Sequence, residues 1–162
     1  PVRVLVPGFI GARSVKWITA ITVQPVPSQN YFQAVDYRIL DIPLSSLPLN
    51  CGILTPDDGA TIPAGPLPVR GYAIAEDCRR IARVEVSADD GVSWRPAELA
   101  AGRSRWAWRQ WSATVAAEPG PLRVTARAWD DAGATHPESP AALWNPGGYG
   151  NNSWPRIALT VA

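Results

Sequence analysis

Short runs of alternating apolar and polar residues, separated by Pro, Gly, Asn and Asp, recur along most of the chain. Such alternation is typical of half-buried β-strands, and runs with the spacing of an amphipathic helix are hard to find. The clearest strand candidates are residues 67–75, 81–88, 92–98, 106–115, 122–129 and 154–161. With a weaker candidate at 60–63, about seven short antiparallel strands predict an all-β, immunoglobulin-like sandwich.

The candidate strand at 106–115 contains three tryptophans that do not share one parity. In a regular strand Trp106 and Trp108 face one side, whereas Trp111 faces the other. A β-bulge near Arg109 would let all three face the core. Burial of these rings separates two interpretations, because rings in the core are structural and rings in an open groove favour a binding module.

The first 46 residues follow a less regular pattern. Residues 3–8 and 17–23 are strand candidates, a loop with two glycines lies between them, and residues 24–46 are irregular. The segment 43–48 is rich in Pro and Ser, which disfavour both helices and sheets. We therefore predict a domain boundary there, with residues 1–46 as the remnant of one domain and residues 47–162 as the sandwich.

The charge balance argues against large anionic partners. Fifteen basic and fourteen acidic side chains leave a net charge of +1, so no global field gathers nucleic acid or acidic membranes. No run of about 18 apolar residues is present to span a bilayer. Neither nucleic acid nor a membrane is therefore expected as a partner. The chain begins at Pro1 and contains no Met, so we expect a piece of a longer protein.

The sequence offers few groups for metal binding or catalysis. Cys51, Cys78 and His136 do not make a convincing zinc site, so no metal ligand is expected in this chain. The cysteines are interpreted as two buried thiols, with a disulfide as the alternative. His136 lies in a polar loop and is expected to be solvated. Three pairs of adjacent aspartates precede glycines, which indicates turns, with calcium binding as the alternative. These pairs are Asp57-Asp58, Asp89-Asp90 and Asp130-Asp131.

Two loops contain donors that suit an anion. The loop at 8–16 combines glycines, which permit close backbone approach, with donors that include Ser14 and Lys16; a plain surface loop is the alternative. The loop that contains Arg79 and Arg80 lies between two strand candidates, where paired guanidinium groups could bind an oxyanion. A solvated loop is the alternative there.

The sequence resembles sulfite oxidases and assimilatory nitrate reductases, a family of molybdopterin-dependent oxidoreductases. The N-terminal motifs PVRVLVPG and GARSVKWI, at 1–8 and 11–18, are similar to the end of the family's molybdopterin-binding domain. Later segments are similar to its dimerisation domain. They are VRGYA at 69–73, ARVEVS at 82–87, DGVSW at 90–94, WAWR at 106–109, AWD at 128–130 and LWNP at 143–146. Together they cover nearly the whole chain.

The resemblance implies roles for individual residues. Arg3 matches an arginine that contacts the pterin cofactor, and the tripeptide Ser14, Val15 and Lys16 matches one that holds the cofactor's phosphate end. Arg79 matches an arginine of the dimerisation domain that reaches toward the oxyanion site beside molybdenum. The resemblance thus implies molybdopterin as the cofactor of the intact protein, with these residues supplying part of its site.

The resemblance also implies a function for the intact protein. That function is two-electron oxygen-atom transfer, with sulfite oxidation as the reaction. The implied partners are a second copy in a homodimer, a small oxyanion such as sulfite, and an electron acceptor such as a cytochrome. The periplasm would suit a bacterial member. The alternative function is a stand-alone sandwich that recognises protein or carbohydrate without catalysis.

Two departures from the family pattern limit these expectations. The family's molybdenum-ligating cysteine lies upstream of the segments present here, so the chain alone is expected to be inactive. Glu76 and Asp77 place two negative charges close to Arg79, which leaves the substrate open. Arg80 has no family counterpart and is expected to be solvated.

Overall fold

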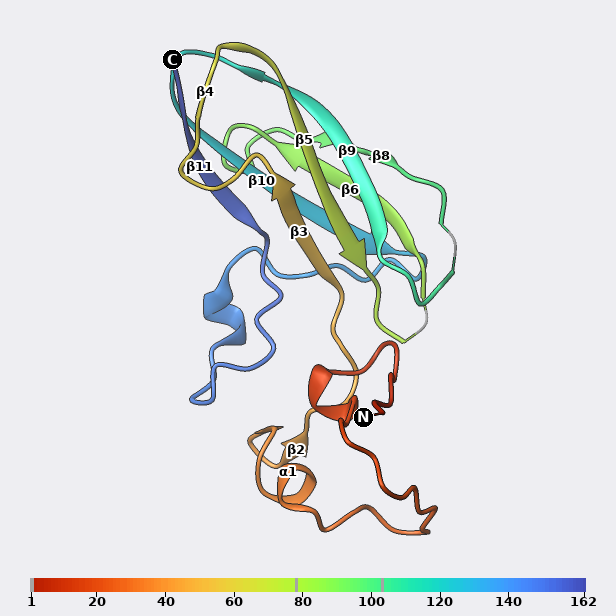
Figure 1. Cartoon of the computed structure of the whole chain (residues 1–162). Coiled ribbons are helices and arrows are strands. Elements are labelled where there is room, and N and C mark those ends of the chain that lie inside the picture. The colour runs from red at the N-terminus through yellow and green to blue at the C-terminus, as the bar shows by residue number, and fades with distance from the viewer. Residues whose placement is uncertain (1, 78, 103) are drawn as a thin grey trace.

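A sandwich of two β-sheets dominates the computed structural model, which describes residues 2–77, 79–102 and 104–162 (Figure 1). Over these residues one sheet has the strand order β3-β5-β9-β8 and the other β4-β11-β10-β6-β7. The strand pairs in both sheets are antiparallel, except that β4 runs parallel to β11. The all-β antiparallel sandwich predicted from the alternating pattern is therefore confirmed.

The strands differ widely in length, and the long ones occupy the centre of each sheet. The first sheet contains β3 (Asn50–Thr55), β5 (Gly65–Ile74), β8 (Glu98–Leu99) and β9 (Arg109–Ala117). The second contains β4 (Thr61–Ile62), β6 (Ile81–Ser87), β7 (Arg95–Pro96), β10 (Gly120–Asp130) and β11 (Arg156–Val161). Outside the sandwich lie η1 (Gly11–Arg13), α1 (Tyr31–Ala34), the hairpin of β1 (Arg38–Ile39) and β2 (Ile42–Pro43), and η2 (Pro140–Leu143).

Inward-facing apolar side chains from both sheets form the core. Alternate residues of a strand point to the same face, so Val84 and Val86 of β6 and Val124 of β10 face Val69 of β5 and Trp111 of β9. The four valines are fully buried and Trp111 is 2% exposed. Burying each such side chain contributes roughly 1.5–3 kcal/mol, so this layer supplies the main stabilisation of the fold.

The three tryptophans of the 106–115 segment divide between core and surface. Trp111 is buried, whereas Trp106 and Trp108 are 44% and 61% exposed. β9 begins at Arg109 and pairs with β5 in one unbroken register, so the predicted bulge near Arg109 is wrong. Trp106 and Trp108 precede the strand, where its alternation does not apply. The Trp108 ring instead stacks on Tyr72, with centroids 4.4 Å apart.

The segment at 92–98, predicted as one returning strand of a hairpin, is divided between the two sheets. β7 pairs with β6, but β8 pairs with β9 in the opposite sheet. Asp90 and Gly91 both have positive φ, at 58° and 97°, as an Asp-Gly turn of type I′ requires. Pairing resumes only at Arg95, because the chain first makes a longer loop.

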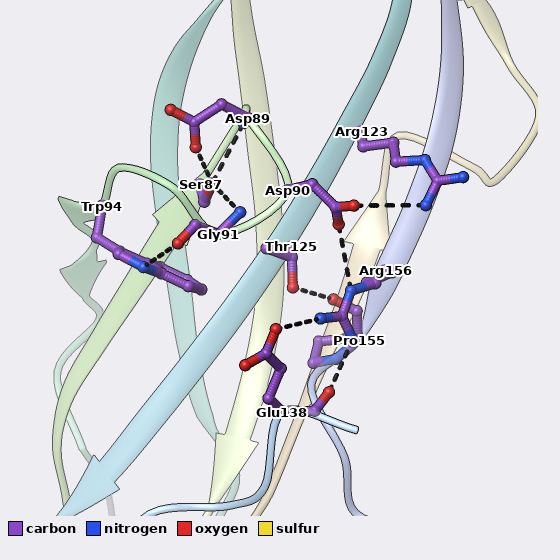
Figure 2. A network of polar contacts seen from close by, with 10 residues as sticks. All are labelled: Ser87, Asp89, Asp90, Gly91, Trp94, Arg123, Thr125, Glu138, Pro155 and Arg156. Carbon is purple, nitrogen blue, oxygen red and sulfur yellow. Dashed lines mark hydrogen bonds and ion pairs between the residues drawn. The ribbon is translucent and has the colours of Figure 1, made fainter. Parts of the chain in front are cut away.

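Polar contacts fasten this loop to β10 and β11 (Figure 2). The Asp90 carboxylate lies 3.4 Å from the Arg123 guanidinium and 3.3 Å from that of Arg156. The Ser87 hydroxyl donates to the Asp89 carboxylate at 2.6 Å. Hydrogen bonds, the largest from Ser87, lower the pKa of Asp89 to about 2. The aspartates at this position therefore act in the turn, as predicted.

The N-terminal candidates at 3–8 and 17–23 do not form strands. Arg3 and Lys16 make only an isolated antiparallel bridge, and residues 18–24 have no regular secondary structure. A strand needs partners for its backbone and cover for its apolar side chains. Ile21 and Val23 are 80% and 96% exposed, so the described residues supply no such cover.

The N-terminal segment lies at the end of the sandwich where β3 begins and β5 ends (Figure 1). The Leu47 N–H donates to the Gly8 carbonyl at 2.8 Å, and the Ile10 N–H donates to the Ser45 carbonyl at 3.0 Å. The segment at 43–48 therefore packs against the loop at 8–16, which we call the glycine loop. The domain boundary placed between Ser46 and Leu47 stays a prediction.

His136 is buried, so the solvated side chain predicted for it is wrong; the ring is 2% exposed. The Ala128 N–H donates to Nε2 at 3.0 Å, which leaves Nδ1 protonated to donate to the Asn152 carbonyl at 2.7 Å. The Asn152 side chain donates in turn to the Leu49 carbonyl at 2.7 Å. These bonds tie the long connection between β10 and β11 to the segment before β3.

We predict that the buried His136 makes the chain less stable in mild acid. Burial lowers the pKa of His136 below its ordinary 6.5. As the pH falls through about 6.5, the unfolded chain therefore binds more protons at this position than the folded chain does. The free energy of unfolding decreases as a result. Urea denaturation at about pH 7.5 and about pH 5.5 measures this loss.

The matched variant is His136→Gln, whose amide oxygen can accept from Ala128 and does not titrate. Its free energy of unfolding is expected to be lower at neutral pH but nearly independent of pH over the same interval. The same pH dependence in both proteins would contradict the assignment to His136.

Candidate cofactor and oxyanion site

Several strand ends meet at one end of the sandwich. β5 ends at Ile74, β6 begins at Ile81, and the loop between them carries Arg79. Arg109, the first residue of β9, pairs with β5 near its end, and Asp130, the last residue of β10, pairs with the first residue of β6. The strand register therefore gathers side chains that are far apart in the sequence beside the N-terminal segment.

The residues predicted to bind the cofactor lie together on two adjacent backbone segments. Arg3 pairs with Lys16, and the Arg3 Nε donates to the Ser14 carbonyl at 2.9 Å. The Val4 N–H donates to the Val15 carbonyl at 3.0 Å. The structure thus brings Arg3, Ser14, Val15 and Lys16 into one small region, while their roles as cofactor ligands stay a prediction.

A groove of about 840 Å³ runs along the second of these segments. Val15 and Lys16 line it, together with the aromatic residues Trp17, Phe32 and Tyr37. The Lys16 Nζ lies 5.7 Å from the centroid of the Trp17 ring. Cationic and aromatic side chains in one groove suit a ligand with an anionic end and a flat heterocycle. This donor set fits a pterin that carries a phosphate.

The Arg79 side chain is held by a buried carboxylate. Its Nη1 lies 3.2 Å from Oδ2 of Asp130, and the Arg79 side chain is 44% exposed where that of Asp130 is 1% exposed. The Arg79 N–H also donates to the Glu76 carbonyl at 3.0 Å. A guanidinium has five N–H donors, and the ion pair with Asp130 uses only one of its nitrogens, Nη1.

Asp130 is a residue whose part in the site the sequence did not reveal. Burial raises its pKa, but hydrogen bonds from the Ala134 N–H, the Arg79 side chain and the Ala132 N–H together hold the pKa below its ordinary value. Asp130 therefore stays ionised and orients Arg79. The turn predicted for Asp130-Asp131 is present, but the carboxylate also reaches across to the loop before β6.

Two contacts join the first 46 residues to the loops at this end of the sandwich. The Ser46 hydroxyl donates to the Glu76 carboxylate at 2.7 Å. Gly8, at a φ of 83°, lies against Trp106, and an added Cβ would come within 3.2 Å of that ring. A side chain at Gly8 would therefore be strained by both its backbone and its neighbour. Glu76 is engaged with Ser46 rather than directed at Arg79.

Residues 42–162 match the family model of the Mo-co oxidoreductase dimerisation domain, and residues 1–32 match that of the oxidoreductase molybdopterin binding domain. The chain belongs to the Mo-co oxidoreductase dimerisation domain family. The family resemblance inferred from the sequence motifs is therefore confirmed, and it implies the molybdenum cofactor for the intact protein.

Mitochondrial sulfite oxidase from Rattus norvegicus is 36% identical over 180 residues, which cover 99% of this chain and 33% of that protein. Inducible nitrate reductase [NADH] 2 from Glycine max is 33% identical over 193 residues, covering 99% of this chain and 22% of that protein. The chain thus spans about a third of the length of the sulfite oxidases it matches. The sulfane dehydrogenase SoxCD from Paracoccus pantotrophus has the same fold, with a TM-score of 0.79 at 23% identity over 94% of this chain and 42% of that one.

Other groups considered from the sequence do not add to this site. Cys51 is buried, and burial raises the pKa of its thiol to about 12, so it is an unreactive core residue. Cys78 lies outside the described residues, so the alternative of a disulfide between Cys51 and Cys78 stays untested. Within the described ranges no three His, Cys, Asp or Glu side chains are grouped as metal ligands. No helix among those residues has the length and apolar character needed to cross a membrane.

We predict that Asp130→Asn destabilises this end of the sandwich by about 1–3 kcal/mol. The amide oxygen can still accept from the Ala132 and Ala134 N–H groups, but an amide nitrogen replaces the oxygen that accepts from Arg79. The Arg79 guanidinium therefore loses its acceptor and faces a second donor. Urea denaturation measures the loss. The control is Asp131→Asn, because Asp131 is exposed and adjacent. An Asp130→Asn protein as stable as the control would show that the ion pair contributes nothing.

Proposed function

We propose that the chain is the dimerisation domain and part of the cofactor site of a molybdenum oxidoreductase that moves an oxygen atom to or from a small oxyanion. Sulfite oxidation is the leading reaction. One observation carries the proposal: the Ser14 to Lys16 segment and the Arg79 loop lie at the same end of the sandwich. The segment at 43–48 connects them, because it packs against the glycine loop and donates from Ser46 to Glu76 of the Arg79 loop. Family membership supplies the class of chemistry.

The N-terminal residues would hold the phosphate end of the pterin. Lys16 supplies a cation at the groove, and Ser14 supplies a hydroxyl, which here accepts from the Val6 N–H at 3.3 Å. Arg3 is exposed and braces the Ser14 carbonyl, so it would fix the segment and present its remaining donors to the pterin. The bound cofactor supplies the exchange of electron pairs and oxygen atoms.

Arg79 would bind and orient the oxyanion. Asp130 fixes one side of the guanidinium, which reduces the entropy lost when the other donors engage a ligand. Charge-assisted hydrogen bonds from those donors favour a doubly charged anion over a neutral one. They also stabilise charge that develops on oxygen during the reaction.

We predict that Arg79→Gln in the intact, cofactor-loaded protein raises the KM for sulfite by more than about tenfold, which corresponds to about 1.4 kcal/mol of binding free energy. Steady-state kinetics and molybdenum content measure the two effects separately. Molybdenum content is expected to stay unchanged, because Arg79 does not line the groove beside Lys16.

The control for this variant is Arg123→Gln, since Arg123 is exposed and paired with Asp90 at the loop after β6. It is expected to leave both KM and kcat at their wild-type values. If Arg79→Gln also left both values unchanged, the assigned role of Arg79 would be wrong.

A stand-alone recognition module is supported less well. Its best evidence is the exposure of Trp106 and Trp108. Trp106 packs against Gly8 of the N-terminal segment, however, and Trp108 stacks on Tyr72. Both rings therefore have partners within the chain, which leaves less aromatic surface for a protein or carbohydrate ligand.

We also propose that the protein is a homodimer that passes its electrons to a cytochrome. The dimer follows from the family to which residues 42–162 belong, and a symmetric pair needs only one self-complementary patch. Sedimentation equilibrium of the chain is expected to give about twice its mass of 17.4 kDa. A mass of 17.4 kDa at every loading concentration would contradict self-association.

A further inference from the structure

The long connection between β10 and β11 reaches the groove beside Lys16. It leaves the sandwich at the end where the N-terminal segment lies (Figure 1). The Tyr149 ring packs on the ring of Tyr37, with centroids 5.7 Å apart and an angle of 34° between the ring planes. Tyr37 lines the groove that Lys16 and Trp17 also line. A residue of the sandwich therefore supports one wall of a groove that belongs to the N-terminal segment.

A shared carboxylate fixes the two tyrosines relative to each other. The Tyr149 hydroxyl donates to Oδ1 of Asp36 at 3.2 Å, and the same oxygen accepts from the Tyr37 N–H at 2.8 Å. The Leu44 N–H donates to the Tyr37 carbonyl at 2.8 Å. Burial and the Asp36 charge raise the pKa of Tyr149 above its ordinary 10, so the hydroxyl stays protonated and remains a donor at neutral pH.

Tyr37 depends on such contacts because its backbone lies in the left-handed region. Its φ is 47°, which a residue with a Cβ rarely adopts and which persists where the surroundings hold it. The Phe32 ring packs on Tyr37 with centroids 5.8 Å apart, and it also lines the groove. A change in the contacts of Tyr37 would therefore move two aromatic rings of the groove.

The loop that carries Tyr149 is itself held in one conformation. Asn145 Nδ2 donates to the Tyr149 carbonyl at 2.7 Å, and Asn145 Oδ1 accepts from the Tyr149 N–H at 3.1 Å. Gly148 and Gly150 have φ of 67° and 73°, which glycine adopts at little cost. Asn152, just beyond, is buried and donates to the segment before β3. The sandwich thus presents Tyr149 at a fixed place, so Tyr149 can hold Tyr37 rather than move with it.

We propose that Tyr149 is a positioning residue for the cofactor site and acts through Asp36 and Tyr37. The inference rests on the proposed function, because that function assigns the groove beside Lys16 to the phosphate-carrying pterin, and it deepens that function by giving the sandwich a part in holding the cofactor. Flat rings pack in offset or edge arrangements that depend on where each ring lies. A fixed aromatic wall therefore favours one orientation of the heterocycle, while Lys16 meets the phosphate.

The rate at which the intact, cofactor-loaded protein loses molybdenum during dialysis tests this role. Tyr149→Phe keeps the ring and removes the hydroxyl, whereas Tyr149→Leu removes both. We expect the rate to rise about threefold in Tyr149→Phe and about tenfold in Tyr149→Leu, because the first loses a hydrogen bond and the second also loses an aromatic contact. The control is Tyr72→Phe, which is expected to lose molybdenum at the wild-type rate. The Tyr72 hydroxyl donates to Oδ1 of Asn50, also at 3.2 Å, but Tyr72 does not line the groove.

Two further measurements separate positioning from a general loss of structure. In the 162-residue chain, hydrogen exchange of residues 31–43 is expected to be faster in Tyr149→Leu than in the wild type, with unchanged exchange in β5 and β10. In the intact protein, the KM for sulfite of the loaded fraction is expected to stay at its wild-type value, because Arg79 does not line this groove. Faster exchange in both sheets, or a raised KM, would overturn the positioning role.

The outcomes distinguish this inference from the function on which it rests. An intact protein that contains no molybdenum would overturn the proposed function, and the inference with it. A protein that contains molybdenum and loses it equally fast with Tyr, Phe or Leu at this position would overturn the role of Tyr149 alone. Because Tyr149→Phe preserves the packing of the ring, it remains a test if Tyr149→Leu fails to fold. A wild-type rate of molybdenum loss in Tyr149→Phe would then overturn the inference, which depends on the contact with Asp36.

Discussion

The packing of apolar side chains between the two sheets is the constraint on which the rest of the structure depends. Val84 and Val124 on one sheet meet Val69 and Trp111 on the other, and each strand must keep its register to bury them. The same register decides where β5 and β10 end and where β6 and β9 begin. Arg79, Arg109 and Asp130 meet at one end of the sandwich because a core elsewhere aligns their strands.

Buried polar contacts then fix the segments that the core does not reach. His136 and Asn152 attach the long connection between β10 and β11 to β10 and to the segment before β3 through backbone groups. Asp130 does the same for the loop that carries Arg79. Each of these contacts replaces water with a protein partner, so each is worth little as a net gain but costly to break. These contacts fix the positions of loops and contribute little to the overall stability of the fold.

Charge is distributed unevenly over a chain whose net charge is only +1. Acidic side chains such as Asp90 and Glu85 lie beside arginines on the sheet that contains β6 and β10, where they form ion pairs. At the end near the N-terminal segment four arginines line one cavity, and of these four only Arg79 has an ion pair within the described residues, the one with Asp130. A local excess of donors suits the small oxyanion that we propose as the substrate, and it requires no field over the whole molecule.

The sequence by itself determined the sandwich and the family, because alternation with period two follows from strand geometry and because the motifs at 1–18 and 69–146 are local strings. It predicted Ser14, Val15, Lys16 and Arg79 as site residues. The fold then places the first three and the Arg79 loop at the same end of the sandwich. Only the tertiary structure decided the buried state of His136, the exposure of Trp106 and Trp108, and the partnership of Asp130 with Arg79. These depend on contacts between residues distant in sequence, which local patterns do not encode: a loop is buried or solvated according to what folds over it.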